Sequence, residues 1–203
     1  MWSMQTVSAF PVLRLASASP RRRELLTQIG VPHSVKAAHI DESRKPSESA
    51  HEYVVRLAKE KAASVWREAA NLPVLAADTT VVLDDEIFGK PRDRDDALQM
   101  LASLSGRIHE VLTAVALATT EGIATSVSES KVRFRKTTAD ERLAYWNTGE
   151  PRDKAGAYAI QGMGAVFIKS ITGSYSGVMG LPLFETAELL RAAKVPCWNG
   201  AAP

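Results

Sequence analysis

A turn rich in arginine is the first feature of this chain that could do chemistry. Ser19 is a good N-cap, and Pro20 suits the first helical position, where its missing N–H is not needed. Arg21, Arg22 and Arg23 follow in the first helical turn, where each cation opposes the helix macrodipole by about 0.3–1 kcal/mol. A multiply charged anion reverses that sign, because hydroxyls, amide N–H groups and guanidinium groups together bind phosphate. The turn therefore predicts either a phosphate site or a solvated basic helix end or nucleic-acid contact.

A carboxylate stands in the middle of an apolar segment. Asp78 lies within Val74–Leu83, a run with β-branched residues that predicts a buried strand. Burying a carboxylate that has no partner costs roughly several kcal/mol of free energy. Asp78 therefore either faces a cleft, where it could deprotonate a water or hold a divalent metal, or accepts hydrogen bonds from nearby backbone at a strand end.

Two lysines could face an anion. Lys61 lies four positions after Leu57 and four before Val65, on the apolar face of a predicted helix. Its ammonium must extend to solvent, meet a carboxylate or enter a polar pocket. Lys90, in the segment Gly89-Lys90-Pro91, is a compact charge suited to phosphate, although lysines in loops are usually solvated.

Other polar candidates lie in predicted loops. Asp41 and Glu42 could supply ligands to magnesium beside a triphosphate. Gln161 lies in the small-residue segment 153–164, and its amide could match the edge of a pyrimidine base, although a turn-rich connection explains the segment equally well. With four histidines and no second one at ligand spacing, a histidine metal site is not expected, and His109 is interpreted as structural.

Alternating strand and helix patterns must position these residues. We expect strands over 12–16, 35–40, 74–83, 87–88, 111–118, 127–134 and 165–171. We expect helices over 20–29 and 50–68, one from the Asp93 cap to Gly106, one from a capping box at Thr138 to Gly149, and one opened by Pro182. The alternation predicts an α/β protein, and the hairpins favour a mixed sheet with flanking helices.

Bulk properties exclude several classes of protein. The 203 residues suit one domain, and a net charge of +2 demands neither nucleic acid nor membrane as a partner. A single cysteine, Cys197, excludes an internal disulfide framework and favours a reducing, cytoplasmic setting. No apolar run reaches the roughly 20 residues of a spanning helix, and no secretory signal is evident. We expect one domain over 1–203, with loose termini over 1–10 and 197–203.

The chain resembles the Maf family of nucleoside triphosphate pyrophosphatases from about residue 12 to 193. The segments that carry the resemblance are Leu15–Arg22, Glu60-Lys61-Ala62, Ala77-Asp78-Thr79, Gly89-Lys90-Pro91, Ser105-Gly106 with His109 and Thr113, Lys154–Tyr158 with Gln161-Gly162, and Gly180-Leu181-Pro182. Residues 153–158 and 160–162 are similar to the branch that acts on dTTP and UTP. The 7-methyl-GTP branch typically has Ser-Asp in place of Ala77-Asp78 and Glu in place of Gln161.

The resemblance implies an activity and a role for each candidate. It implies hydrolysis of the α–β phosphate bond of dTTP and UTP, in a nucleotide cleft between two lobes of a fold similar to inosine triphosphate pyrophosphatases. Asp78 would be the proton acceptor, with Lys61, Lys90 and Glu42 as further catalytic residues. Substrate would be bound by Ser17, Ser19, Arg21, Arg22, Thr79 and Gln161, of which Arg21, Thr79 and Gln161 would select the base. Asp78 and Glu42 would hold Mg²⁺ or Mn²⁺, and the family suggests a homodimer.

Two other functions stay open at this point. One is a pyrophosphatase for 7-methyl-GTP or another purine triphosphate. The other is a non-catalytic nucleotide-binding regulator of cell division, which would keep the arginine turn and lysines but would not need a carboxylate at position 78. A nucleic-acid-binding module is disfavoured, because the chain has no extended basic face.

Overall fold

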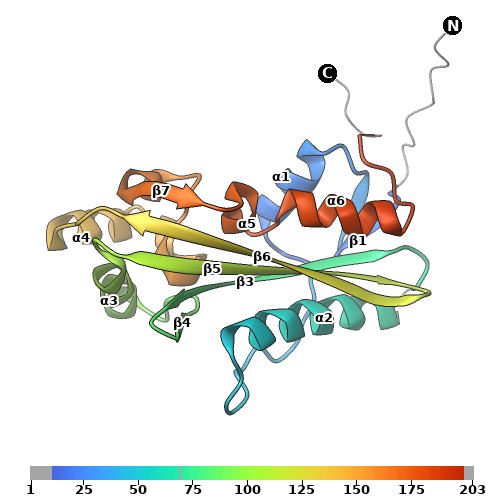
Figure 1. Cartoon of the computed structure of the whole chain (residues 1–203), viewed down its shortest axis with the longest axis horizontal. Coiled ribbons are helices and arrows are strands. Elements are labelled where there is room, and N and C mark those ends of the chain that lie inside the picture. The colour runs from blue at the N-terminus through green and yellow to red at the C-terminus, as the bar shows by residue number, and fades with distance from the viewer. Residues whose placement is uncertain (1–10, 69, 199–203) are drawn as a thin grey trace, which may run out of the picture.

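The computed structural model describes residues 11–68 and 70–198. Within these ranges seven strands form one mixed sheet that runs the length of the molecule (Figure 1). The strands are β1 Leu13–Leu15, β2 His33–Val35, β3 Val74–Leu83, β4 Glu86–Phe88, β5 Ile108–Thr119, β6 Gly122–Phe134 and β7 Ile168–Thr172. Their order is β2-β1-β3-β5-β6-β7, with β4 also paired to β3. β1 is parallel to β2 and β3, whereas the other pairs are antiparallel.

Helices cover both faces of the sheet. Figure 1 shows α2 on one face, α1, α5 and α6 on the other, and α3 and α4 at one end. The helices are α1 Pro20–Gln28, α2 Ala50–Glu68, α3 Arg94–Leu104, α4 Ala139–Asn147, α5 Tyr175–Met179 and α6 Leu183–Ala192, with short 3₁₀ segments η1 Glu150–Asp153, η2 Ala155–Ala157 and η3 Met163–Phe167. Asp93 and Thr138 cap their helices as predicted, and the capping box of Thr138 and Glu141 is complete.

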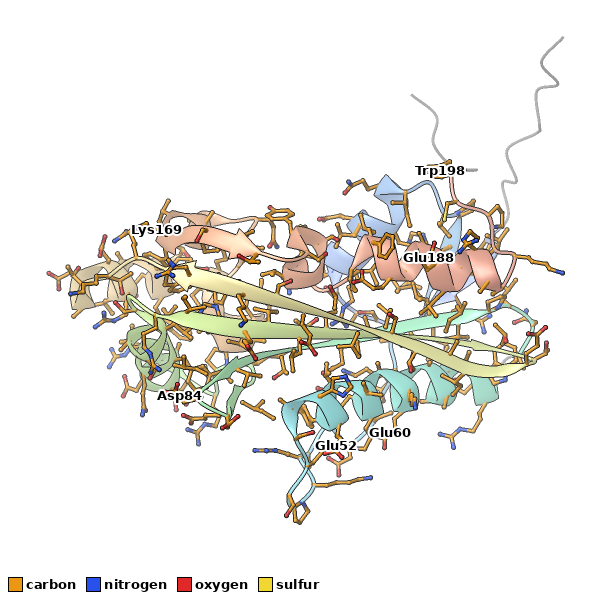
Figure 2. All side chains as sticks on the ribbon, in the orientation of Figure 1. Glu52, Glu60, Asp84, Lys169, Glu188 and Trp198 are labelled. Atoms are coloured by element: carbon orange, nitrogen blue, oxygen red, sulfur yellow. The ribbon has the colours of Figure 1, made fainter. Side chains whose placement is uncertain are left out.

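Side-chain alternation along β3 divides the core. Leu75 and Ala77 point to the face of α1 and α6, and Val81 packs farther along that face in the cluster under α3 and α4. Val74 and Ala76 point to the opposite face, against α2. In contrast, the charged side chains of Glu52, Asp84, Lys169 and Glu188, which are labelled in Figure 2, are exposed. The two clusters on the α1 face are separated along β3, and Thr79 is the residue of that face between them.

The structure confirms the mixed α/β fold and corrects several boundaries. The strand expected over 35–40 is instead His33–Val35, because its parallel partner β1 ends at Leu15. The strand expected over 165–171 is Ile168–Thr172, preceded by the 3₁₀ segment η3. The short helix α5 was not predicted. β5 and β6 extend beyond the apolar segments expected over 111–118 and 127–134, because the two strands pair along their whole length as one long hairpin.

The termini lie mostly outside the described residues. The expectation of a loose N-terminus falls on residues 1–10, and that of a loose tail falls largely on 199–203, all outside the described part. Within the described part, the partly buried Cys197 packs against the apolar cluster that contains Leu26 of α1 and Leu190 of α6. The amide of Trp198 donates to the carbonyl of Ile29 at 2.8 Å.

Candidate active site

A cleft of about 570 Å³ opens beside the middle of β3, within the usual range for ligand sites. It is walled by the start of α1, the chain between β2 and α2, the Gly89–Lys90 loop and the segment 153–161. All ten residues expected to act on substrate or metal line it: Ser17, Ser19, Arg21, Arg22, Glu42, Lys61, Asp78, Thr79, Lys90 and Gln161. The structure thus brings together residues that are far apart in the sequence.

An ion-paired carboxylate lies inside the cleft. Asp78, 7% exposed, follows the even-numbered face of β3 toward α2. Lys61, 8% exposed, comes from the apolar face of α2 and donates to Oδ1 of Asp78 at 2.6 Å. The same ammonium lies 2.8 Å from Oε1 of Glu42, whose side chain is half exposed. Of the three surroundings expected for the Lys61 ammonium, which were solvent, a carboxylate or a polar pocket, the structure shows contact with carboxylates.

Burial and charge act in opposite directions on these carboxyl groups. Burial raises the pKa of Asp78 above its ordinary value, although Lys61 and Arg22 partly offset this. Burial also disfavours the charged form of Glu42, but the hydrogen bond and charge of Lys61 outweigh it and lower the pKa of Glu42. The cleft therefore holds one carboxyl group with a raised affinity for protons beside one that stays ionised, an arrangement frequent in catalytic sites.

The guanidinium of Arg22 is largely committed to the protein. Its Nε donates to the carbonyl of Gly180 at 2.7 Å, and Nη1 donates to the carbonyl of Ala77 at 2.7 Å. Nη2 donates to Oγ1 of Thr79 at 3.2 Å. Arg22 thus lines the cleft as expected, but in this structure it joins α1, β3 and the loop before α6.

The remaining expected residues face the cleft from different walls. Arg21 reaches across it, with Nη1 3.9 Å from Oδ2 of Asp153. Thr79 and Gln161 line the cleft, and Gln161 and Lys90 are exposed. Neither the side chain of Gln161 nor that of Lys90 forms a hydrogen bond with any residue in the described ranges, so each can contact a ligand.

The start of α1 also differs from its expected detail. Ser19 is the N-cap by position, but its side chain makes no capping hydrogen bond. Its amide instead donates to Oγ of Ser17 at 3.1 Å. The Ser19 side chain therefore accepts from none of the first amides of α1, which suits anion binding there.

Sequence reasoning missed one cation of the cleft. The side chain of Lys154 lines the wall opposite α1, is 12% exposed and pairs with Asp153. Its place in a segment of small residues was the available signal, since small neighbours leave a lysine free to reach a shared cavity. Five lysines and arginines and three carboxylates line the cleft, so it carries an excess of positive charge.

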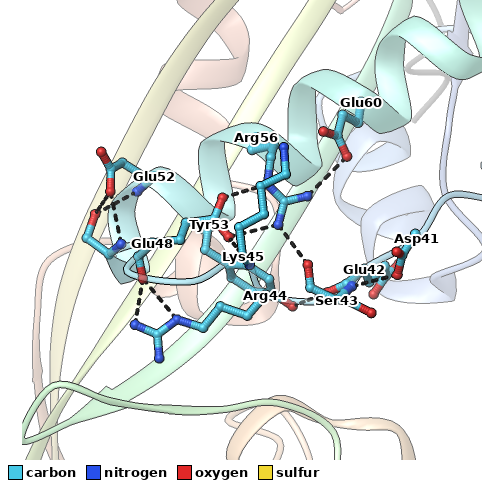
Figure 3. A network of polar contacts seen from close by, with 11 residues as sticks. Asp41, Glu42, Ser43, Arg44, Lys45, Glu48, Glu52, Tyr53, Arg56 and Glu60 are labelled. Carbon is cyan, nitrogen blue, oxygen red and sulfur yellow. Dashed lines mark hydrogen bonds and ion pairs between the residues drawn. The ribbon is translucent and has the colours of Figure 1, made fainter.

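A network of polar contacts fixes the loop that carries Glu42 (Figure 3). Arg56 of α2 binds both carboxylate oxygens of Glu48, at 2.5 and 2.8 Å, and donates to the carbonyl of Ser43 at 3.0 Å. The hydroxyl of Tyr53 donates to the carbonyl of Glu42 at 2.9 Å. The backbone of Glu42 is thereby held against α2, close to Lys61.

The donor set fits a hard divalent cation. Carboxylates of Asp78 and Glu42 converge on one ammonium, and Mg²⁺ commonly uses one or two protein carboxylates with phosphate oxygens and waters. Over residues 11–68 and 70–198, no group of three or more His, Cys, Asp or Glu is placed to hold a metal by itself. A metal held by these two carboxylates would complete its shell with phosphate oxygens or waters.

His109 is buried and does not line the cleft. It is 1% exposed, and its Nε2 lies 2.8 Å from the hydroxyl of Tyr158, with the rings of Phe134 and Tyr158 packed edge-on against it. Burial lowers the pKa of His109 to about 4. Its role is to support Tyr158, which lines the cleft.

No helix in the described ranges combines the length and the apolar character that crossing a bilayer requires.

Comparisons with known proteins agree on one family. A family model described as Maf-like protein matches residues 12–193. A dTTP/UTP pyrophosphatase of Bordetella avium is 55% identical over 196 residues, covering 91% of this chain and 96% of the relative. Those of Saccharophagus degradans and Shigella sonnei are 50% and 54% identical, covering 94% and 88% of this chain and 93% and 91% of the relatives.

One solved structure, the Staphylococcus aureus Ham1 protein, matches with a TM-score of 0.43 and 12% identity, over 60% of this chain and 70% of that one.

Proposed function

This chain belongs to the Maf-like protein family, and we propose that it is an enzyme that hydrolyses dTTP and UTP to the nucleoside monophosphate and pyrophosphate. Relatives that cover most of its length at 50–55% identity carry the name dTTP/UTP pyrophosphatase. The observation that carries the proposal is the buried ion pair of Asp78 and Lys61 in a cleft with excess positive charge.

In the proposed reaction a water attacks the α-phosphorus of the bound triphosphate. A P–O bond forms to the water oxygen while the bond from the α-phosphorus to the bridging oxygen breaks, and pyrophosphate leaves with the electron pair. Asp78 accepts the proton from the water, a role that its raised pKa favours. Positioning and electrostatic stabilisation supply most of the catalysis in reactions of this kind.

Cations of the cleft stabilise the developing charge. Lys61 holds Asp78 in place and lies where it can face a phosphate oxygen. Lys90 and Lys154 line the cleft and suit the leaving pyrophosphate, since lysine acts as a compact charge toward phosphate. Arg22 keeps the carbonyl and hydroxyl groups around Thr79 in position. Ser17 and Ser19 would contact phosphate oxygens at the start of α1.

Asp78 and Glu42 would hold the divalent metal, Mg²⁺ or Mn²⁺, which neutralises charge on the phosphate oxygens when bound. Base selection would come from Arg21, Thr79 and Gln161, which line the cleft.

A panel of triphosphates tests the proposal directly. The protein is incubated with dTTP, UTP, CTP, GTP, 7-methyl-GTP and ATP in the presence of Mg²⁺ or Mn²⁺, and pyrophosphate release is followed over many turnovers. We expect dTTP and UTP to be hydrolysed with the highest kcat/KM. Preference for a purine would contradict the substrate assignment, and binding without turnover would support a non-catalytic regulator instead.

A further inference from the structure

Two residues outside the cleft lining hold the backbone on both sides of Gln161. Tyr145 of α4 donates its hydroxyl to Oε1 of Glu150 at 2.6 Å, and the same hydroxyl accepts from the amide of Ala159 at 3.1 Å. Glu150 of η1 accepts from the amide of Met163 through Oε2 and from the amide of Gly164 through Oε1, both at 3.0 Å. The segment 159–164 is thus fixed two residues before Gln161 and two and three residues after it.

The pair approaches the backbone so closely that it leaves no room for a side chain at two positions unless it moves. A Cβ on Gly162 would lie 2.0 Å from Oε2 of Glu150. A Cβ on Gly164 would lie 2.6 Å from the hydroxyl of Tyr145. A side chain at either position would therefore displace Glu150 or Tyr145 from the backbone that it contacts.

The protonation states of the pair suit this role. Burial disfavours the charged form of Glu150, but hydrogen bonds from Tyr145, Gly164 and Met163 outweigh it and keep its pKa below the ordinary value. Burial and the neighbouring carboxylate raise the pKa of Tyr145. At neutral pH Glu150 is an acceptor on both oxygens, and Tyr145 is a fixed donor.

The pair is itself anchored in the core. Tyr145 is 5% exposed, and its ring packs edge-on against Phe167 at 5.2 Å between centroids. Gln161, in contrast, is exposed to the cleft and forms no side-chain hydrogen bond within the described residues. A rotatable amide offers a donor or an acceptor in either orientation, so the placement of its backbone must decide which base edge it meets.

We propose that Tyr145 and Glu150 are positioning residues that set base selectivity by fixing the backbone of Gln161. The inference rests on the proposed function, since it concerns how the same site distinguishes bases. It assigns a role to two residues that do not line the cleft.

The test uses Glu150→Gln and Tyr145→Phe. The first replaces one accepting oxygen by an NH₂ group that faces an amide N–H, and the second removes the acceptor of the Ala159 amide. Removing these hydrogen bonds loosens the backbone of Gln161, which predicts a rise of about tenfold in KM for dTTP and UTP, with kcat changed less than about threefold. Selectivity for UTP over GTP, measured as a ratio of kcat/KM, should fall by about tenfold.

Two further measurements separate positioning from stability. Hydrogen exchange at the amides of Met163 and Gly164 should be slow in the wild type and at least about tenfold faster in Glu150→Gln. In a double-mutant cycle, Glu150→Gln should have little further effect on selectivity when Gln161 is already Ala. A general loss of structure would not depend on the residue at 161.

Glu141→Gln is the matched control. It removes the charge of the residue that closes the capping box of the same helix and so the ion pair with Arg135, without touching the segment 159–164. We expect lower stability with unchanged selectivity.

Each failure is distinguishable. A wild type that hydrolyses no pyrimidine triphosphate overturns the proposed function. If the wild type is active and Glu150→Gln leaves KM and selectivity unchanged, only the positioning role is overturned. Fast exchange of the Met163 and Gly164 amides in the wild type overturns that role without any variant.

Discussion

The ammonium of Lys61 lies 2.6 Å from Oδ1 of Asp78, although the two residues are 17 positions apart in the sequence and belong to a helix and a strand. Each side chain faces the other because it follows the face set by its own element, the apolar stripe of α2 and the even-numbered side of β3. The pair therefore requires no local distortion, and each group partly offsets the cost of burying the other.

Asp78→Asn should abolish turnover of dTTP and UTP. The amide has nearly the same shape but cannot accept a proton from water, so a loss of at least about 10²-fold in kcat is expected. Nucleotide binding, measured by calorimetry with a non-hydrolysable analogue, should stay within about threefold, because the cations of the cleft remain. Near-normal turnover would remove Asp78 from its role.

Lys61→Met should move the acid limb of the pH–rate profile upward. Burial raises the pKa of Asp78, and Lys61 is the largest influence that opposes this rise. Without the ammonium, Asp78 becomes harder to ionise, and the base form is lost at a higher pH. The check is kcat/KM against pH for both proteins with the same substrate, so that titration of the triphosphate cancels. An identical acid limb would show that the pair does not control the base.

Much of the fold was predictable because its signals are local. The apolar run of β3, the stripe of α2 and the capping box at Thr138 each specify an element through neighbours in the sequence. The expected strand over 35–40 was wrong because a strand ends where its partner ends, and β1 is only three residues long. Such a limit is a property of pairing and cannot be seen in either segment alone.

The site was predictable as a set of residues but not as an arrangement. The cost of burying Asp78 and Lys61 indicated that each needed a partner, yet only the tertiary structure shows that they partner each other. Arg22 was expected to bind substrate, but three nitrogens of its guanidinium group donate to oxygens of the protein. Nothing in the arginine turn distinguished Arg22 from Arg23, which is exposed.

Arg22→Lys should destabilise the protein by about 2–3 kcal/mol, because a lysine cannot replace the planar fork and leaves buried carbonyls of Ala77 and Gly180 without donors. Urea unfolding measures the change. Arg23→Lys, one position along and exposed, is the control and should stay within about 0.5 kcal/mol of the wild type. Equal stability of the two variants would mean that the Arg22 contacts add nothing to the fold.

His109 should make stability fall with pH below neutrality. Burial lowers its pKa in the folded protein to about 4, below the value of about 6.5 in an unfolded chain, so the unfolded state takes up the proton first as pH falls. The stabilisation is therefore complete above about pH 6.5 and is lost progressively toward pH 4; between about pH 7 and pH 5 the loss is about 2 kcal/mol.

Urea unfolding at pH 7 and at pH 5 measures this loss of stability. His109→Gln should remove this part of the dependence, although it is less stable at pH 7, whereas the exposed His51→Gln should retain the wild-type dependence. Equal pH dependence in the wild type and His109→Gln would show that the buried imidazole is not the group that titrates.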